Sequence, residues 1–132
     1  MSSTKSGRKN RMIGVDTGFF FALREGDPTA LKVFEEEDIA ASVLTRFELR
    51  RLSFRKSIPW SDFAVHLTRS VMILELTAET ADQAAAISHG TGLPAIDALI
   101  LASLVAAGCR TIYTRDEHFL RLVRQDVEII RL

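Results

Sequence analysis

The chain has 132 residues, of which 47% are hydrophobic and 26% are charged, values typical of one globular domain with a buried core. No apolar run approaches the roughly 20 residues that span a bilayer, and residues 1–11 lack the apolar centre of a signal peptide. Cys109 is the single cysteine, which excludes an internal disulfide and a cysteine-rich metal site. We therefore expect a cytoplasmic protein without a membrane segment.

The net charge is zero, but the charges are unevenly distributed along the sequence. The first eleven residues contain no acid, so the remainder of the chain is acidic overall. The basic residues of this opening stretch are Lys5, Arg8, Lys9 and Arg11. Its polar composition predicts a disordered basic extension over residues 1–11, followed by one domain over residues 12–132.

From residue 12 onward, strand and helix signals alternate. Short apolar runs rich in branched side chains predict strands, and longer segments with capping residues predict helices. In chain order we expect a strand at 12–16, helices at 17–26 and 28–37, a strand at 38–42, helices at 43–56 and 59–69, a strand at 71–76, helices at 78–92 and 95–108, a strand at 110–114, a helix at 117–125 and a strand at 127–132. The alternation predicts an α/β fold of three layers, α/β/α, with a central, mainly parallel five-stranded sheet.

Two acidic residues stand where sites form in such sheets, beyond the carboxyl ends of the strands. Asp16 ends the first expected strand, and Asp116 follows the fourth. Each of them is equally well explained as a helix N-cap. Glu48 has two ordinary interpretations as well, a solvated pair with Arg51 and a capping box with Thr45.

Asp97 is harder to explain as a structural residue. It is the one charged residue in "GLPAIDALILASL", and its helix is apolar on nearly all sides, which predicts burial. A buried carboxylate without a partner destabilises a protein, and the helix N-terminus relieves only part of its charge. If Asp97 converged with Asp16 and Asp116, their repulsion would raise their pKa values unless a cation intervened. Oxygen ligands suit Mg²⁺ or Mn²⁺, ions that serve phosphodiester hydrolysis.

Other chemistries fit the sequence less well. The histidines, His66, His89 and His118, are far apart in sequence, which disfavours zinc. The chain has no P-loop and no Gly-x-Gly-x-x-Gly segment, so it carries no nucleotide-binding signal.

Four segments together resemble the PIN domain family, specifically its small prokaryotic toxin type, called VapC. These segments are "IGVDTGFFFAL", "SVLTRFELRR", "GLPAIDALILASLVAAG" and "TIYTRDEHF". The resemblance covers residues 12–132. It places the four acids of the family at Asp16, Glu48, Asp97 and Asp116, with the neighbouring hydroxyl at Thr114. His118 stands where many relatives carry a further acid, a departure that bears on a second metal site.

The resemblance implies an endoribonuclease that uses Mg²⁺ or Mn²⁺, forms homodimers and is blocked by a small antitoxin protein. It also implies that Asp16, Asp97 and Asp116 surround one metal ion, directly or through water. Glu48 would then position or deprotonate the attacking water, and Thr114 would hold an acid or a water.

Cations must flank such an acidic pocket before RNA can bind. The candidates for substrate binding are Arg46, Arg50, Arg115 and His118. A solvated basic face explains any one arginine equally well, and a partly exposed helix histidine is the more ordinary interpretation of His118. Two alternative functions stay open: a PIN-fold nuclease that acts in RNA processing or DNA repair outside a toxin pair, and a PIN-fold binding module that does not cleave.

The stretch "GFFFAL" bears on assembly. Successive helical residues are turned by about 100°, so three consecutive phenylalanines cannot all face one side. We expect at least one of Phe19, Phe20 and Phe21 to be exposed and to contribute to a homodimer interface.

Overall fold

The structure is a computed structural model that describes residues 12–120 and 126–132. The predicted basic extension at residues 1–11 and the end of the helix predicted at 117–125 lie outside the described residues.

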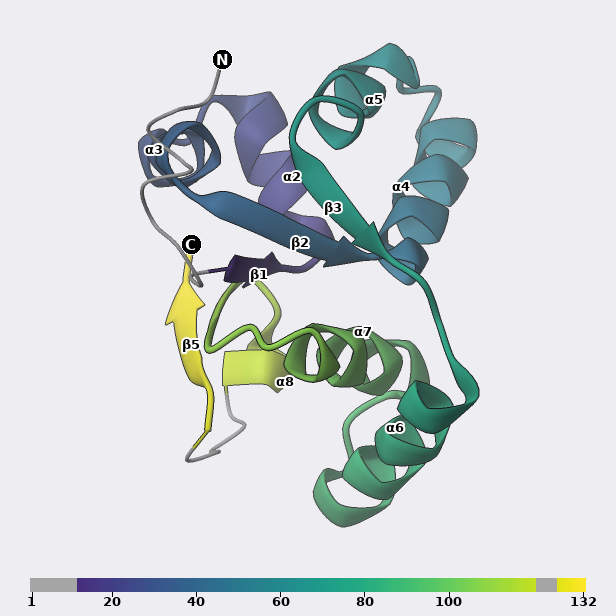
Figure 1. Cartoon of the computed structure of the whole chain (residues 1–132). Coiled ribbons are helices and arrows are strands. Elements are labelled where there is room, and N and C mark those ends of the chain that lie inside the picture. The colour runs from purple at the N-terminus through teal and green to yellow at the C-terminus, as the bar shows by residue number, and fades with distance from the viewer. Residues whose placement is uncertain (1–11, 121–125) are drawn as a thin grey trace.

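A parallel five-stranded sheet with the strand order β3-β2-β1-β4-β5 forms the centre of the described structure (Figure 1). The strands are β1 (Met12–Val15), β2 (Asp38–Ser42), β3 (Val71–Leu74), β4 (Thr111–Thr114) and β5 (Glu128–Arg131). Each pair of neighbouring strands is parallel, so the sheet is wholly parallel where a mainly parallel one was predicted. The carboxyl ends of all strands therefore lie at one edge.

Helices cover both faces of the sheet, which confirms the predicted layers (Figure 1). The helices are α2 (Thr17–Glu25), α3 (Pro28–Glu36), α4 (Val43–Lys56), α5 (Ser61–Leu67), α6 (Ala78–Thr91), α7 (Ala95–Ala106) and α8 (Glu117–Leu120). The first four lie on one side of the sheet, and the last three lie on the other. None of these described helices is long and apolar enough to cross a membrane.

Local sequence signals explain where several elements begin and end. Gly26 ends α2 in the left-handed conformation with φ 82°, which a glycine adopts without strain. Asp27 then caps α3, and its carboxylate accepts a hydrogen bond from the Thr29 N–H at 2.9 Å. Gly14 in β1 allows α7 to lie close, because a Cβ there would meet Leu104 at 3.1 Å.

Several predicted elements are shorter than expected, among them β3 and α5. The last pairing between β2 and β3 joins Ser42 to Leu74, and β2 ends there because α4 begins, so β3 does not continue to residue 76. The helix predicted to start at Pro59 begins at Ser61 instead. A turn precedes it, in which the Pro59 carbonyl accepts from the Asp62 N–H at 3.0 Å.

The expectation of an exposed phenylalanine in α2 is wrong. Phe19 and Phe20 are fully buried, and Phe21 is half-buried with its ring edge-on to Phe63 at 5.3 Å between centroids. All three can be covered because α2 is enclosed by more than the sheet: α4 and α5 also pack against it. This stretch therefore gives no support to a homodimer.

Candidate functional site

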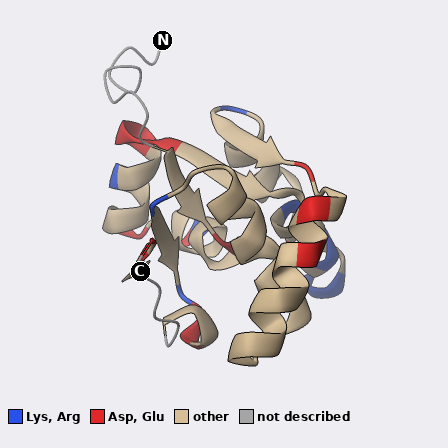
Figure 2. Ribbon diagram, turned by 60° about the horizontal axis from the view of Figure 1, so that its bottom comes forward, with Lys and Arg blue, Asp and Glu red and all other residues tan. Residues whose placement is uncertain are grey.

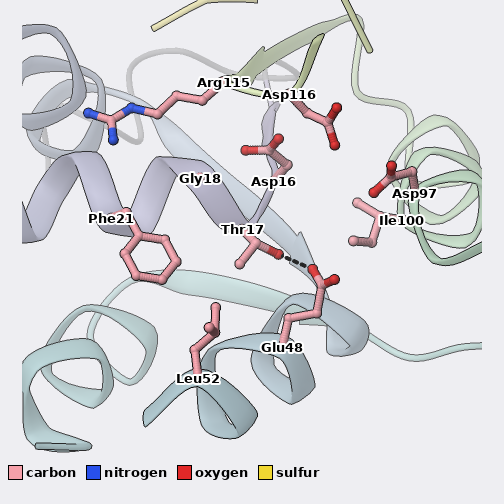
Figure 3. Close-up of a pocket in the computed structure, with 10 residues that line it drawn as sticks. All are labelled: Asp16, Thr17, Gly18, Phe21, Glu48, Leu52, Asp97, Ile100, Arg115 and Asp116. Atoms are coloured by element: carbon pink, nitrogen blue, oxygen red, sulfur yellow. Dashed lines mark hydrogen bonds between the residues drawn. The ribbon is translucent and has the colours of Figure 1, made fainter. Parts of the chain in front are cut away.

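A pocket of about 320 Å³ opens where the carboxyl ends of β1 and β4 meet the helices that follow (Figure 3). It brings together all four predicted acids, although they come from distant parts of the chain. The pocket is lined by Asp16, Thr17, Gly18, Phe21, Glu48, Leu52, Asp97, Ile100, Arg115 and Asp116.

Asp16 is the most deeply buried of the four acids, with 5% of its surface exposed. It follows β1 and caps α2, with its Oδ1 accepting a hydrogen bond from the Phe19 N–H at 3.3 Å. Burial raises the pKa of Asp16 to about 6, against the opposing effect of a hydrogen bond from Thr114. Asp16 therefore caps α2, as one interpretation of the sequence held, and it also lines the pocket.

Thr114 connects two of the acids from a fully buried position at the end of β4. Its hydroxyl donates a hydrogen bond to the Asp16 carboxylate and accepts one from the Asp116 N–H at 2.8 Å. Asp116 in turn accepts a hydrogen bond from the His118 N–H at 2.8 Å, which makes it the cap of the short helix α8. The contact between Thr114 and Asp16 thus couples the ends of the two adjacent strands β1 and β4.

Asp97 lies in the first turn of α7, on the far side of the pocket from β1 (Figure 3). Its side chain is partly buried. Burial raises the pKa of Asp97 to about 7, and the negative charges of Asp116 and Glu48 raise it as well. A carboxylate in this position is destabilised in the absence of a cation, as the sequence predicted.

Glu48 reaches the pocket from α4, where its carboxylate accepts a hydrogen bond from the Thr17 hydroxyl (Figure 3). The capping box that would have paired it with Thr45 is not formed. Ser42 caps α4 instead, accepting from the Leu44 N–H at 3.0 Å, and Thr45 is fully buried.

The donor set in the pocket fits a divalent cation. Among the described residues, Asp97, Asp116 and His118 offer ligand atoms that all lie within 4.8 Å of one another. Asp16 is outside this set, because Thr114 and the first turn of α2 hold its carboxylate. Clustered carboxylate oxygens are the donors that Mg²⁺ and Mn²⁺ prefer, and a cation would offset the repulsion that raises two of the pKa values.

The predicted substrate-binding arginines lie in two different places. Arg115 lines the pocket and forms an ion pair with Glu25 at 2.8 Å, and that hydrogen bond raises the pKa of Arg115. Arg46 and Arg50 lie outside the pocket on an exposed face of α4. Both guanidinium groups stack over the ring of Trp60, at 5.5 and 4.8 Å from its centroid.

Helix α4 carries a dense group of basic residues, which is the largest blue area in Figure 2. They are Arg46, Arg50, Arg51, Arg55 and Lys56. The same helix exposes Phe47 and Phe54, which are 54% and 71% exposed. Arg50 also stacks over the Phe54 ring at 4.8 Å, so cations and aromatic rings alternate on this surface.

Sequence reasoning missed Thr17 and Gly18 of the pocket, as well as its apolar residues Leu52 and Ile100. Thr17 was not singled out, yet it holds Glu48. Gly18 was also overlooked, and a Cβ there would meet the Arg115 Cβ at 3.1 Å and the Asp16 Oδ1 at 3.4 Å. Both residues follow Asp16 directly in "DTG", so their place beside the first acid was the available signal.

The fold and the pocket define a class of protein, an α/β domain with an acidic site at the carboxyl edge of its parallel sheet. Residues 13–125 match the PIN domain family, and the chain therefore belongs to that family. This confirms the family that the four sequence segments indicated.

Solved structures with a similar fold include proteins of toxin–antitoxin pairs. A chain of the DNA-bound VapBC from Salmonella typhimurium matches with a TM-score of 0.70 and 16% identity, over 92% of this chain and 98% of that one. A chain of VapBC2 from Rickettsia felis, bound to a promoter DNA fragment, matches with a TM-score of 0.69 and 16% identity, over 91% of this chain and 98% of that one. Mycobacterium tuberculosis VapC20, a Sarcin-Ricin loop cleaving toxin, matches with a TM-score of 0.68 and 23% identity, over 88% of this chain and 98% of that one. At these identities the likeness shows the fold alone. No curated protein has a significantly matching sequence.

Proposed function

We propose that this PIN domain is a metal-dependent endoribonuclease and the toxin of a type II toxin–antitoxin pair. The observation that carries the proposal is the convergence of four carboxylates from four parts of the chain on one pocket, with raised pKa values at Asp16 and Asp97. A protein keeps such a repulsive cluster where a cation is to be bound. The similarity in fold to VapC20 and to two VapBC proteins supports RNA as the substrate and an antitoxin as the partner.

Asp97 and Asp116 are the proposed direct ligands of Mg²⁺, for which Mn²⁺ would substitute, and Asp16 would hold the ion directly or through a water molecule. When bound, such an ion orients the phosphate, activates water and stabilises the leaving oxygen. Thr114 fixes the orientation of Asp16 through its hydroxyl, and it holds Asp116 through the backbone N–H. Glu48 accepts the proton of the attacking water, and the hydrogen bond from Thr17 orients its carboxylate toward the pocket.

The basic and aromatic surface of α4 is the proposed binding site for the RNA strand. Arginine side chains neutralise phosphates, and exposed aromatic rings stack on unpaired bases. Arg46 and Arg50 are already held against Trp60, so little side-chain freedom is lost when they bind. Arg115 and His118, at the pocket itself, would contact the phosphate nearest the scissile bond.

A cleavage assay with matched substrates tests the activity. RNA and DNA oligonucleotides of the same sequence are incubated with the purified chain in Mg²⁺, in Mn²⁺ and in EDTA. We expect cleavage of the RNA alone, dependent on the metal and absent in the Asp16→Asn variant. Asparagine still caps α2, so this variant keeps the fold. Saturable metal binding without cleavage of RNA would favour a non-cleaving module, and cleavage of DNA would favour a role in repair.

The partner and the assembly form the remaining part of the proposal. We infer that residues 12–132 form the nuclease domain, that it acts in the cytoplasm as a homodimer, and that a small antitoxin blocks it. Expression of the chain in a bacterial host should arrest growth, and co-expression of the gene adjacent to its own should restore growth. Sedimentation at micromolar concentration measures the oligomeric state directly.

A further inference from the structure

His118 is held at the rim of the acidic pocket by two contacts with one carboxylate. Its backbone N–H donates to the Asp116 Oδ1 at 2.8 Å, and its imidazole Nδ1 lies 2.9 Å from the same oxygen. Nδ1 also lies 3.9 Å from the Asp97 Oδ2, on the opposite wall. The side chain is half-exposed, yet its nitrogen is turned toward the two acids.

The two distances from His118 Nδ1 are compatible with ligands of a single ion. With ligands about 2.1 Å from an octahedral ion, neighbouring ligand atoms are about 3.0 Å apart and opposite ones about 4.2 Å apart. The 2.9 Å distance from Nδ1 is close to the spacing of neighbouring ligands, and the 3.9 Å distance lies between the two values.

We propose that His118 is a metal ligand, which gives this site a mixed nitrogen and oxygen donor set that prefers transition-metal ions to Mg²⁺. The inference rests on the metal site of the proposed function and adds a ligand and a selectivity to it. Mg²⁺ binds oxygen donors and retains its waters, whereas imidazole is a favourable ligand for Fe²⁺, Co²⁺ and the later ions. An imidazole in the shell therefore raises the affinity for those ions more than it raises the affinity for Mg²⁺.

Pulsed electron paramagnetic resonance of the Mn²⁺-loaded full-length chain tests the ligand directly. A directly bound imidazole nitrogen produces a ¹⁴N modulation of the Mn²⁺ signal. We expect this modulation in the wild-type protein and in His89→Gln, because His89 lies on the exposed surface of α6 outside the pocket. We expect its loss in His118→Asp, which keeps a donor group at the position but removes the nitrogen.

Equilibrium titration with Co²⁺ and with Mg²⁺ tests the selectivity. The ratio of the Co²⁺ affinity to the Mg²⁺ affinity should fall by about tenfold or more in His118→Asp and remain unchanged in His89→Gln.

The proposal would be overturned if the wild type bound Mn²⁺ without nitrogen modulation, or if it did not bind Mn²⁺ at all. A ratio of Co²⁺ affinity to Mg²⁺ affinity that His118→Asp leaves unchanged would overturn it as well. None of these readouts requires RNA cleavage. Nitrogen modulation in a protein that does not cleave RNA would uphold the ligand assignment and refute the nuclease.

Discussion

Replacing Asp97 by asparagine should make the metal-free protein more stable while it abolishes cleavage. Asp97 is a destabilised carboxylate, because burial and the charges of Asp116 and Glu48 raise its pKa from 3.8 to about 7. Each pKa unit corresponds to about 1.4 kcal/mol, so the shift sets an upper limit of about 4 kcal/mol on the penalty at alkaline pH. Solvent screens a partly exposed group, which reduces the expected gain to roughly 1–2 kcal/mol.

The gain should depend on pH in a defined way. The folded-state pKa of Asp97 lies above the ordinary value of 3.8, so the penalty is absent below that value and complete above a pH of about 7. At about pH 5 only about a third of the penalty is present, since the penalty grows linearly between the two pKa values. Asp97→Asn should therefore raise the melting temperature by roughly 3–8 °C at about pH 8, and by less at about pH 5.

Thermal unfolding in EDTA, followed by circular dichroism, measures this difference. Asp82→Asn is the matched control, because Asp82 is an exposed aspartate on α6 that does not line the pocket. Addition of Mn²⁺ should reverse the order of the melting temperatures, since the wild type binds the ion more tightly and is stabilised by mass action. A metal-free Asp97→Asn protein that melts below the wild type at pH 8 would show that Asp97 supports the fold, and the electrostatic reasoning would then be refuted.

Three further predictions concern the pocket and the surface of α4. Calorimetry should show Mn²⁺ affinity rising between about pH 5.5 and 7.5 and then levelling off. Protons compete with the ion at Asp16 and Asp97, whose pKa values are about 6 and about 7. An affinity that does not change with pH would contradict these pKa shifts. Thr114→Val should lower the free energy of unfolding by about 1–3 kcal/mol and slow cleavage, because the Asp116 N–H loses its acceptor. Thr114→Ser should restore both, and equal melting temperatures for the two variants would count against this role. Replacing Arg46 and Arg50 by alanine in the Asp16→Asn background should weaken the salt dependence of RNA binding, measured by fluorescence anisotropy. The slope of the logarithm of the affinity against the logarithm of the salt concentration should become shallower by about 1.4. An unchanged slope would exclude phosphate contacts at these two arginines.

The alternation of strands and helices was readable from the sequence because the strands are short, mostly apolar runs and most helices have a capping residue. The same alternation predicted that Asp16 and Asp116 lie at one edge of the sheet, since the carboxyl ends of parallel strands meet there. The end of β3 and the start of α5 were not predictable from the sequence. β3 stops where its partner β2 stops, and α5 starts after a turn at Pro59. Those limits are set by neighbours that a local pattern does not contain.

The sequence was sufficient to predict the four acids of the pocket, but not the hydrogen bonds that hold them in place. Asp97 was conspicuous because a lone charge in an apolar helix needs an explanation, and its raised pKa now gives that anomaly a magnitude. The hydrogen bond between Thr17 and Glu48 joins residues 31 positions apart, and no local spacing predicts it. The failure at Phe21 has the same origin: helical periodicity describes one helix, whereas exposure depends on what packs against it.

The hydrogen bond from Thr114 to Asp16 spans 98 positions of the chain, and this separation has a consequence for synthesis. When a ribosome has just added residue 110, the emerging polypeptide contains Asp16, Glu48 and Asp97 but neither Thr114 nor Asp116. The strand that carries Thr114 must then insert beside β1, the central strand of the sheet, before the last acid reaches the others. A chain interrupted before that point lacks Asp116 of the pocket and Thr114, which holds Asp16, so the four acids come together only after β4 has joined the sheet.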